Sequence, residues 1–207
     1  MTPVTQRSRP RSRSRAVWRR RIAAALLAIP AAVAALYVFG PLGDAVRELT
    51  LPLKHEDIIR QQAREKDLDP ALIAAIIYEE SKFRDQTSHA GARGLMQITP
   101  ATAEFIARDS GGHAFEQGDL GEPQINIAYG SYFLRYLLRQ YDGDETLAIA
   151  AYNAGETNVN EWVAEAGGRD EFDSARDIPF KETRDYVRDV KQKRKQYREN
   201  YADELGL

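Results

Sequence analysis

Apolar residues recur at helical spacing between residues 70 and 81, in the sequence PALIAAIIYEES. The pattern predicts a helix with one wide apolar face. Asp69 is a suitable N-cap, and Pro70 fits the first turn, where its missing N–H costs no hydrogen bond. Glu80 continues the apolar face one turn further, whereas Glu79 is turned about 100° away, toward water. Four large side chains form the face: Leu72, Ile73, Ile76 and Ile77.

Further helical segments follow, and we find no extended run of the polar–apolar alternation that is typical of a strand. Helices are expected over residues 55–67, 100–108, 124–141, 144–154, 157–166 and about 180–201. The segment 124–141 has seven regularly spaced apolar side chains that we expect to pack in the core: Ile125, Ala128, Tyr129, Tyr132, Phe133, Tyr136 and Leu137. The sequence therefore predicts one all-α domain over residues 54–201.

Three segments precede this domain. Residues 1–21 are rich in Arg, Ser and Pro and are predicted to be disordered. Residues 22–40 are uncharged, and as a helix they would span about 28 Å, close to the hydrocarbon thickness of a bilayer. The flanking arginines predict a single-pass anchor with a cytoplasmic N-terminus and an extracytoplasmic domain. Residues 41–53 are expected to form a linker.

Two other interpretations of residues 22–40 stay open. Ala32, Val33 and Ala34 form an acceptable small-x-small cleavage site, so the segment could be a signal peptide and the domain secreted. Alternatively, it could be a buried helix behind a nucleic-acid-binding arm. Apolar residues continue past the cleavage site over 36–39, which favours the anchor.

The composition excludes several classes of site. The 207-residue chain has no cysteine, which rules out disulfides, thiolate metal sites and a cysteine nucleophile. Its three histidines, His55, His89 and His113, do not have a metal-ligand spacing, so no metal is expected. Eight of the 29 basic residues fall within residues 1–21, which leaves the domain acidic and makes nucleic-acid binding by it unexpected.

The acidic residue at the end of the apolar stripe has two interpretations. Glu80 could simply mark the exposed end of the helix. If it is partly buried instead, loss of solvation disfavours the charged carboxylate and raises its pKa. A carboxylic acid that is protonated near neutral pH can act as the general acid of a glycosidase. The polar loop after it, SHAGARG, contains small residues that would let the backbone approach a ligand closely.

Four motifs occur in one order along the chain: Glu80-Ser81; Gly91-Ala92 with Gly94-Leu95-Met96-Gln97-Ile98 and Pro100; Ala151-Tyr152-Asn153-Ala154-Gly155; and Glu182-Thr183-Arg184 with Tyr186-Val187. This series resembles the catalytic core of the soluble lytic transglycosylases, glycoside hydrolase family 23, which is related to goose-type lysozyme. The resemblance covers about residues 54–190 and implies a lysozyme-like helical fold. Thr99 departs from the family pattern, in which many members have methionine before the proline, and this puts a substrate contact at position 99 in doubt.

The resemblance implies a role for each matching residue. Glu80 would be the catalytic acid and then the base. Substrate contacts are implied for Ser81, Gly94, Met96, Gln97, Tyr152, Asn153 and Glu182. Simpler structural roles stay open for four of these residues: Ser81 as a polar helix end, Met96 in packing, Asn153 as a helix cap and Glu182 in an ion pair.

The resemblance also implies a reaction. In lytic transglycosylases the C6 hydroxyl of N-acetylmuramic acid attacks its own anomeric carbon and forms a 1,6-anhydro end. Because nucleophile and electrophile belong to one sugar, a single enzyme carboxyl suffices. Asp85 and Glu104 lie near Glu80 in sequence, but no motif singles them out. The alternatives are a hydrolase on the same fold and a non-catalytic wall-binding module. We expect peptidoglycan glycan strands as the partner, no cofactor and a monomer; the sequence identifies no partner in the cell-wall machinery.

Overall fold

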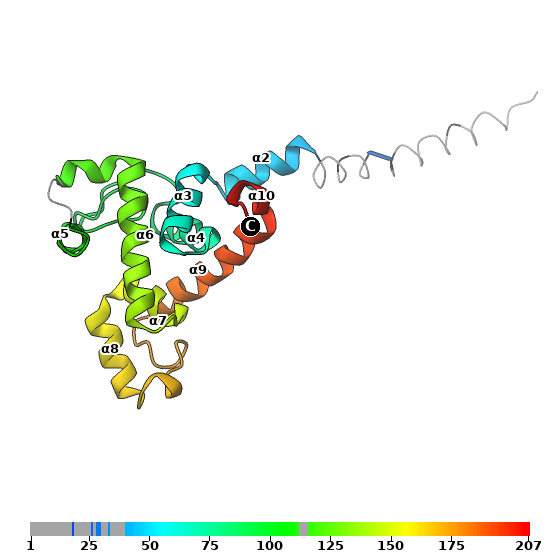
Figure 1. The fold of residues 1–207 in the computed structure, drawn as a ribbon. Helices are drawn as coiled ribbons and strands as arrows, with labels where there is room; N and C mark the ends of the chain where they lie inside the picture. Colours follow the sequence, from blue (N-terminus) through cyan, green and yellow to red (C-terminus); the bar gives the residue numbers. More distant parts are fainter. Residues whose placement is uncertain (1–17, 19–25, 27, 30–32, 34–39, 112–115) are drawn as a thin grey trace, which may run out of the picture. The chain divides into compact units, whose positions relative to one another are not determined.

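The computed structural model describes residues 18, 26, 28, 29, 33, 40–111 and 116–207 (Figure 1). The chain divides into two compact units, Met1–Thr50 and Leu51–Leu207. In the first unit, helix α2 spans Pro41–Thr50, in a stretch that was predicted to be a linker. The predicted tail and most of the predicted anchor lie outside the described residues. Within the described part of the chain, no helix combines the length and apolar character needed to cross a membrane.

The second unit is helical, as predicted. Its helices are α3 (Glu56–Lys66), α4 (Pro70–Ser81), α5 (Pro100–Asp109), α6 (Pro123–Gln140), α7 (Glu145–Ala154), α8 (Glu156–Glu165), α9 (Lys181–Asn200) and α10 (Ala202–Leu205), with 3₁₀ turns η1 (Gln117–Gly121) and η2 (Arg169–Glu171). The two isolated bridges of the described residues join Thr87 to Arg93 and Arg93 to Ile98, in the loop between α4 and α5. The all-α prediction is therefore confirmed for the described residues.

Helix α4 is at the centre of this unit, and α9 packs along it (Figure 1). Its seven residues Ala71–Ile77 are all buried, so the helix is enclosed on every side. The expectation of a single apolar face was wrong here: the small residues Ala71, Ala74 and Ala75 cover the remaining sides and allow neighbouring helices to approach closely. Burying this helix is a major source of stability, at about 1.5–3 kcal/mol for each large apolar side chain.

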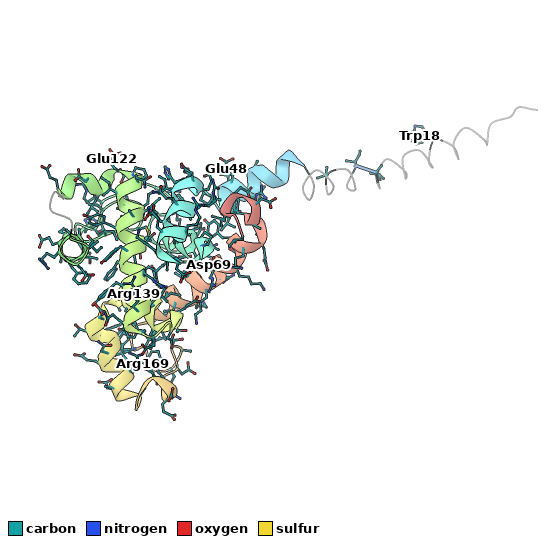
Figure 2. All side chains as sticks on the ribbon, viewed as in Figure 1. Trp18, Glu48, Asp69, Glu122, Arg139 and Arg169 are labelled. Atoms are coloured by element: carbon teal, nitrogen blue, oxygen red, sulfur yellow. The ribbon has the colours of Figure 1, made fainter. Side chains whose placement is uncertain are left out.

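Asp69 connects the start of α4 to two other helices. Its Oδ1 accepts a hydrogen bond of 2.9 Å from the Ala71 N–H, as an N-cap does. Its Oδ2 accepts from Arg194 and from Arg198 of α9, and Arg194 also binds Glu145 in the first turn of α7. Figure 2 labels Asp69 between α4 and α9. This ion-pair network fixes α9, and with it the side chains that α9 presents at the other end of α4.

The predicted core face of α6 was wrong in part. The buried face comprises Asn126, Ile127, Gly130, Ser131, Leu134 and Leu137, and only Leu137 belongs to the predicted stripe. The aromatic residues lie beside this face and are partly exposed. Glycine is required at position 130 on the buried face because Met96 packs there. A Cβ on residue 130 would lie 2.3 Å from the Met96 sulfur.

Candidate active site

Glu80 occupies the last turn of α4 and is partly buried. Its Oε1 accepts a hydrogen bond of 2.6 Å from the hydroxyl of Tyr186, in the second turn of α9. The packing of α9 along α4 brings these two residues together across the sequence. Tyr186 belongs to the fourth motif, but no role was predicted for it, because nothing in the local pattern shows which face of α9 meets α4.

Burial raises the pKa of Glu80 to about 7, because removal of water disfavours the charged carboxylate. The hydrogen bond from Tyr186 stabilises the charged form and opposes this shift, while the neighbouring Glu79 raises the pKa further. A carboxyl with this pKa is present in both protonation states near neutral pH. Glu80 is therefore suited to give up a proton and to take one back.

Glu79 was expected to face water, but it too is partly buried, and burial raises its pKa. Lys82 and Lys193 lower that pKa and Asp189 raises it. Both lysines also lie over the ring of Tyr78, at 4.6 Å and 4.3 Å from its centroid. Glu79 thus belongs to a charged surface cluster at the end of α4, one residue before Glu80 on the same helix.

The loop between α4 and α5 is fixed beside Glu80 by a buried amide. The side chain of Asn126 has no exposed surface. Its Oδ1 accepts from the Met96 N–H at 2.7 Å, and its Nδ2 donates to the carbonyls of Arg93 at 2.9 Å and Leu120 at 3.0 Å. Sequence reasoning missed Asn126, whose one available signal was an amide among apolar neighbours at the start of α6.

Gly94 is required in this loop for packing. It has φ +76°, and a Cβ would lie 2.2 Å from Asn126 Nδ2 and 2.4 Å from the Leu120 carbonyl oxygen. Glycine was expected here to admit a ligand, but the close approach seen in the structure is to α6 and η1. The side chain of Met96 is also fully buried, against Gly130. Direct ligand contacts by Gly94 and Met96 stay predictions, and the structure gives both residues a role in packing.

Ser81 joins the end of α4 to the same loop. Its hydroxyl is buried and lies 2.7 Å from the Leu95 carbonyl oxygen and 3.1 Å from the Ile77 carbonyl oxygen. Ser81 therefore holds the loop against the helix that carries Glu80.

Gln97 lies at the turn of this loop with φ +48°. Its Nε2 donates to the carbonyls of Gly94 at 2.8 Å and Gln86 at 3.0 Å. The amide nitrogen is thus used to hold the loop, which leaves the amide oxygen as the atom available to a ligand.

The Tyr-Asn motif at the end of α7 completes the surroundings of Glu80. Tyr152 donates a hydrogen bond of 2.9 Å to the Met96 carbonyl, so α7 is bound to the loop. Burial and the charge of Glu80 raise the pKa of Tyr152 well above its usual value, which keeps its hydroxyl protonated. Asn153 Oδ1 accepts from Thr183 of α9 at 2.8 Å, and the exposed Glu182 precedes that threonine. The other three motifs are thus joined to Glu80 or to the loop beside it. The loop is bound by Ser81, Tyr152 is bound to the loop, and Tyr186 is bound to Glu80 itself.

A row of aromatic rings extends from Tyr152 over α6 to α5. Phe133 lies 5.5 Å from Tyr152 and 6.1 Å from Tyr136, and Tyr136 lies 4.8 Å from Phe105, between ring centroids. All four rings are partly exposed. They form an apolar surface that begins beside the candidate acid. In the described residues, no group of three or more His, Asp or Glu side chains is arranged to hold a metal ion.

Comparison with known proteins adds three observations. The family model described as Transglycosylase SLT domain matches residues 57–174 of this chain. The soluble lytic murein transglycosylase of Salmonella typhimurium is 37% identical over 160 residues, which cover 74% of this chain and 24% of that protein. The membrane-bound lytic murein transglycosylase F of Pasteurella multocida is 40% identical over 96 residues, which cover 43% of this chain and 18% of the relative.

A solved structure is also similar. The 70 kDa soluble lytic transglycosylase of Escherichia coli superposes with a TM-score of 0.70 at 31% identity, covering 82% of this chain and 28% of that one. The predicted lysozyme-like transglycosylase fold is thereby confirmed. The chain spans about a quarter of the length of these soluble relatives.

Proposed function

This chain belongs to the transglycosylase SLT family, and on that premise we propose that it is a lytic transglycosylase acting on peptidoglycan. It would cleave the β-1,4 bond between N-acetylmuramic acid and N-acetylglucosamine. The observation that carries the proposal is the partly buried carboxyl of Glu80, with a pKa of about 7 and a fixed hydrogen-bond donor in Tyr186.

In the first step, protonated Glu80 gives its proton to the glycosidic oxygen as the bond from that oxygen to the anomeric carbon breaks. The leaving strand departs with a new hydroxyl. Positive charge develops on the muramic acid ring, and the N-acetyl carbonyl of the same sugar stabilises it. The hydrogen bond from Tyr186 strengthens as Glu80 becomes charged, so it favours the transition state over the ground state.

In the second step, the C6 hydroxyl of the same sugar attacks the anomeric carbon and loses its proton to Glu80. A bond from C6 oxygen to the anomeric carbon replaces the one that was broken, and Glu80 returns to its protonated state. No water is consumed. The neighbouring carboxyl of Glu79 lies on the same helix and belongs to a charged cluster with Lys82 and Lys193. The single-carboxyl mechanism does not require a second carboxylate on the opposite side of the sugar.

The remaining motif residues divide into two groups under this proposal. The Gln97 amide oxygen, Asn153 and the exposed carboxylate of Glu182 contact the sugar or its substituents. Tyr152 orients the loop through the Met96 carbonyl and keeps a neutral hydroxyl beside Glu80. Ser81, Gly94 and Met96 act through packing and hydrogen bonds that fix the loop.

The test is product analysis of purified cell-wall sacculi digested with the wild type and with Glu80→Gln. We expect muropeptides with anhydromuramic ends, lighter by one water than reducing ends, from the wild type only. Reducing ends from the wild type would instead establish a hydrolase. Equal lysis by both proteins would identify another catalytic group, and absence of lysis by the wild type would leave a wall-binding module.

We further propose that residues 22–40 hold the domain at the outer face of the cytoplasmic membrane. Their uncharged composition and the eight preceding arginines support this, and relatives named both soluble and membrane-bound exist. Membrane fractionation and protease accessibility in spheroplasts test it. In spheroplasts, external protease digests an anchored domain. In fractionation without protease, the anchored protein remains with the membrane after a carbonate wash. Release into the periplasmic or culture fraction with loss of the N-terminal residues would show cleavage instead.

A further inference from the structure

A cavity of about 430 Å³ opens between the C-terminal end of α7, the start of α8 and the N-terminal end of α9. Asn153, Asn158, Phe180 and Glu182 line it. Two of these residues are neighbours in sequence of the residues around Glu80: Asn153 follows Tyr152 directly, and Glu182 precedes Tyr186 by one helical turn. The bond from Thr183 to Asn153 joins its two sides.

Phe180 is the unusual member of this lining, because 54% of it is exposed although its side chain is large and apolar. Its ring meets Trp162 in an edge-on contact, with centroids 5.7 Å apart, and Trp162 itself is only 5% exposed. The preceding Ile178 is fully buried, and its carbonyl accepts a 2.6 Å hydrogen bond from Arg184. The structure therefore holds Phe180 in place with a large part of its surface open to the cavity.

The polar groups around Phe180 fit an uncharged polyhydroxyl ligand. Asn153 uses its amide oxygen to accept from Thr183, which leaves its amide nitrogen as a donor. Asn158 uses its amide nitrogen to donate to the Ala154 carbonyl at 2.7 Å, which leaves its oxygen as an acceptor. Glu182 adds a carboxylate, and Lys181 is paired with Asp185, which also binds Arg188. The hydrogen-bonding groups left to a ligand are thus two amides and a carboxylate, which suit the hydroxyl and acetamido groups of a sugar ring.

We infer that this cavity is a saccharide subsite in which Phe180 stacks against the apolar face of one pyranose ring of the glycan strand. Asn153, Asn158 and Glu182 then bind the hydroxyl and acetamido groups at the ring edge. The inference rests on the proposed function, because it places the bound ring in the same strand whose bond Glu80 cleaves. It assigns Phe180 and Asn158 to substrate binding, although neither residue belongs to the four motifs.

The test compares two substitutions at position 180 with a control substitution elsewhere. Phe180→Leu keeps apolar bulk against Trp162 but removes the flat ring, Phe180→Tyr keeps the ring, and Leu207→Ala removes an exposed apolar side chain elsewhere. Binding is measured in the full-length Glu80→Gln background, with peptide-free glycan strands prepared by amidase treatment. We expect Phe180→Leu to weaken the Kd roughly five- to tenfold, and Phe180→Tyr and Leu207→Ala to change it less than about twofold.

Steady-state kinetics in the active protein separate binding from folding. Loss of uniform binding raises KM and leaves kcat unchanged, whereas a distorted site lowers kcat. Trp162 supplies a spectroscopic signal, because a sugar ring stacked on Phe180 alters the surroundings of Trp162 without touching the indole. We expect glycan to change tryptophan emission in the Glu80→Gln protein, and this change to disappear in Glu80→Gln/Trp162→Phe.

Equal glycan affinity of the Phe180→Leu and Phe180→Tyr proteins would overturn the inference. A defect of Phe180→Leu seen only with stem-bearing muropeptides would overturn it too, since the cavity would then bind the peptide. Failure of the proposed function has a different signature: Glu80→Gln would remain lytic or the wild type would release no anhydro ends, whatever residue occupies position 180.

Discussion

Tyr186 Oη lies 2.6 Å from Glu80 Oε1, and the phenol of α9 donates to the carboxyl of α4. Burial and the charge of Glu80 hold the pKa of Tyr186 well above its usual value, so the phenol stays a donor at every physiological pH. The hydrogen bond favours ionised Glu80, while burial disfavours it, and the balance sets the pKa near 7. Tyr186 is therefore a positioning residue that also tunes the candidate acid.

Tyr186→Phe should raise the pKa of Glu80, because it removes the hydrogen bond that stabilises the carboxylate. In the wild type, kcat/KM should fall as pH rises above about 7, where Glu80 loses its proton. In the variant this alkaline limb should move to higher pH, and the maximal kcat should drop roughly 10- to 100-fold as the carboxyl loses its fixed orientation. The pH profile of anhydro-product release measures both effects.

Tyr132→Phe is the matched control for that experiment. It also removes a phenol that donates to a carboxylate, here Asp109 at 2.7 Å on the surface. Its pH profile should coincide with that of the wild type. An alkaline limb that stays in place in Tyr186→Phe would show that this hydrogen bond does not tune Glu80.

Glu80→Gln should stabilise the protein at alkaline pH relative to the wild type. Between the unfolded pKa of 4.5 and the folded pKa of about 7, the native state keeps a proton that the unfolded state has lost. The stability contributed by Glu80 is thus complete below pH 4.5 and is lost as pH rises through 7. We expect the difference between variant and wild type to grow by on the order of 2–3 kcal/mol from pH 4 to pH 8.

Urea denaturation of both proteins at several pH values measures this difference, because groups that do not interact with Glu80 titrate alike in the two. A difference that does not change with pH would mean that the pKa of Glu80 is the same in the folded and unfolded states.

Asn126→Ala should destabilise the domain by about 3 kcal/mol, because the Met96 N–H and the carbonyls of Arg93 and Leu120 lose their buried partner. Asn160→Ala is the control: its exposed amide accepts one hydrogen bond, from Tyr141, and its removal should cost less than about 1 kcal/mol. Chemical denaturation compares the two. Equal losses would mean that the loop does not depend on this amide.

Gly94→Ala should cost more stability than Gly143→Ala although both glycines have positive φ, +76° and +87°. At Gly143 a Cβ meets no atom within 4 Å, so only backbone strain applies, about 1 kcal/mol. At Gly94 the Cβ overlaps Asn126 Nδ2 and the Leu120 carbonyl, and we expect a loss of at least about 3 kcal/mol and of activity. Thermal unfolding of both variants tests this, and similar Tm values would contradict it.

Most helix boundaries could be predicted from the sequence because they depend on neighbours in the chain. Thr99 caps α5 by accepting from Thr102, and Asp144 caps α7 by accepting from Thr146 and Leu147. The core face of α6 could not be predicted in this way. Its aromatic stripe and the face with Asn126 and Gly130 are both plausible, and the choice depends on Met96, which lies 34 residues before Gly130.

The sequence by itself determined the all-α class, the central helix ending in Glu80 and the order of the motifs, because helix periodicity and capping act over a few residues. Only the tertiary structure decided that Tyr186 binds Glu80, that Asn126 holds the Met96 loop and that Phe180 stays exposed beside a cavity. These relationships join residues far apart in the chain. They depend on how the helices pack, which the spacing of side chains within any one helix does not specify.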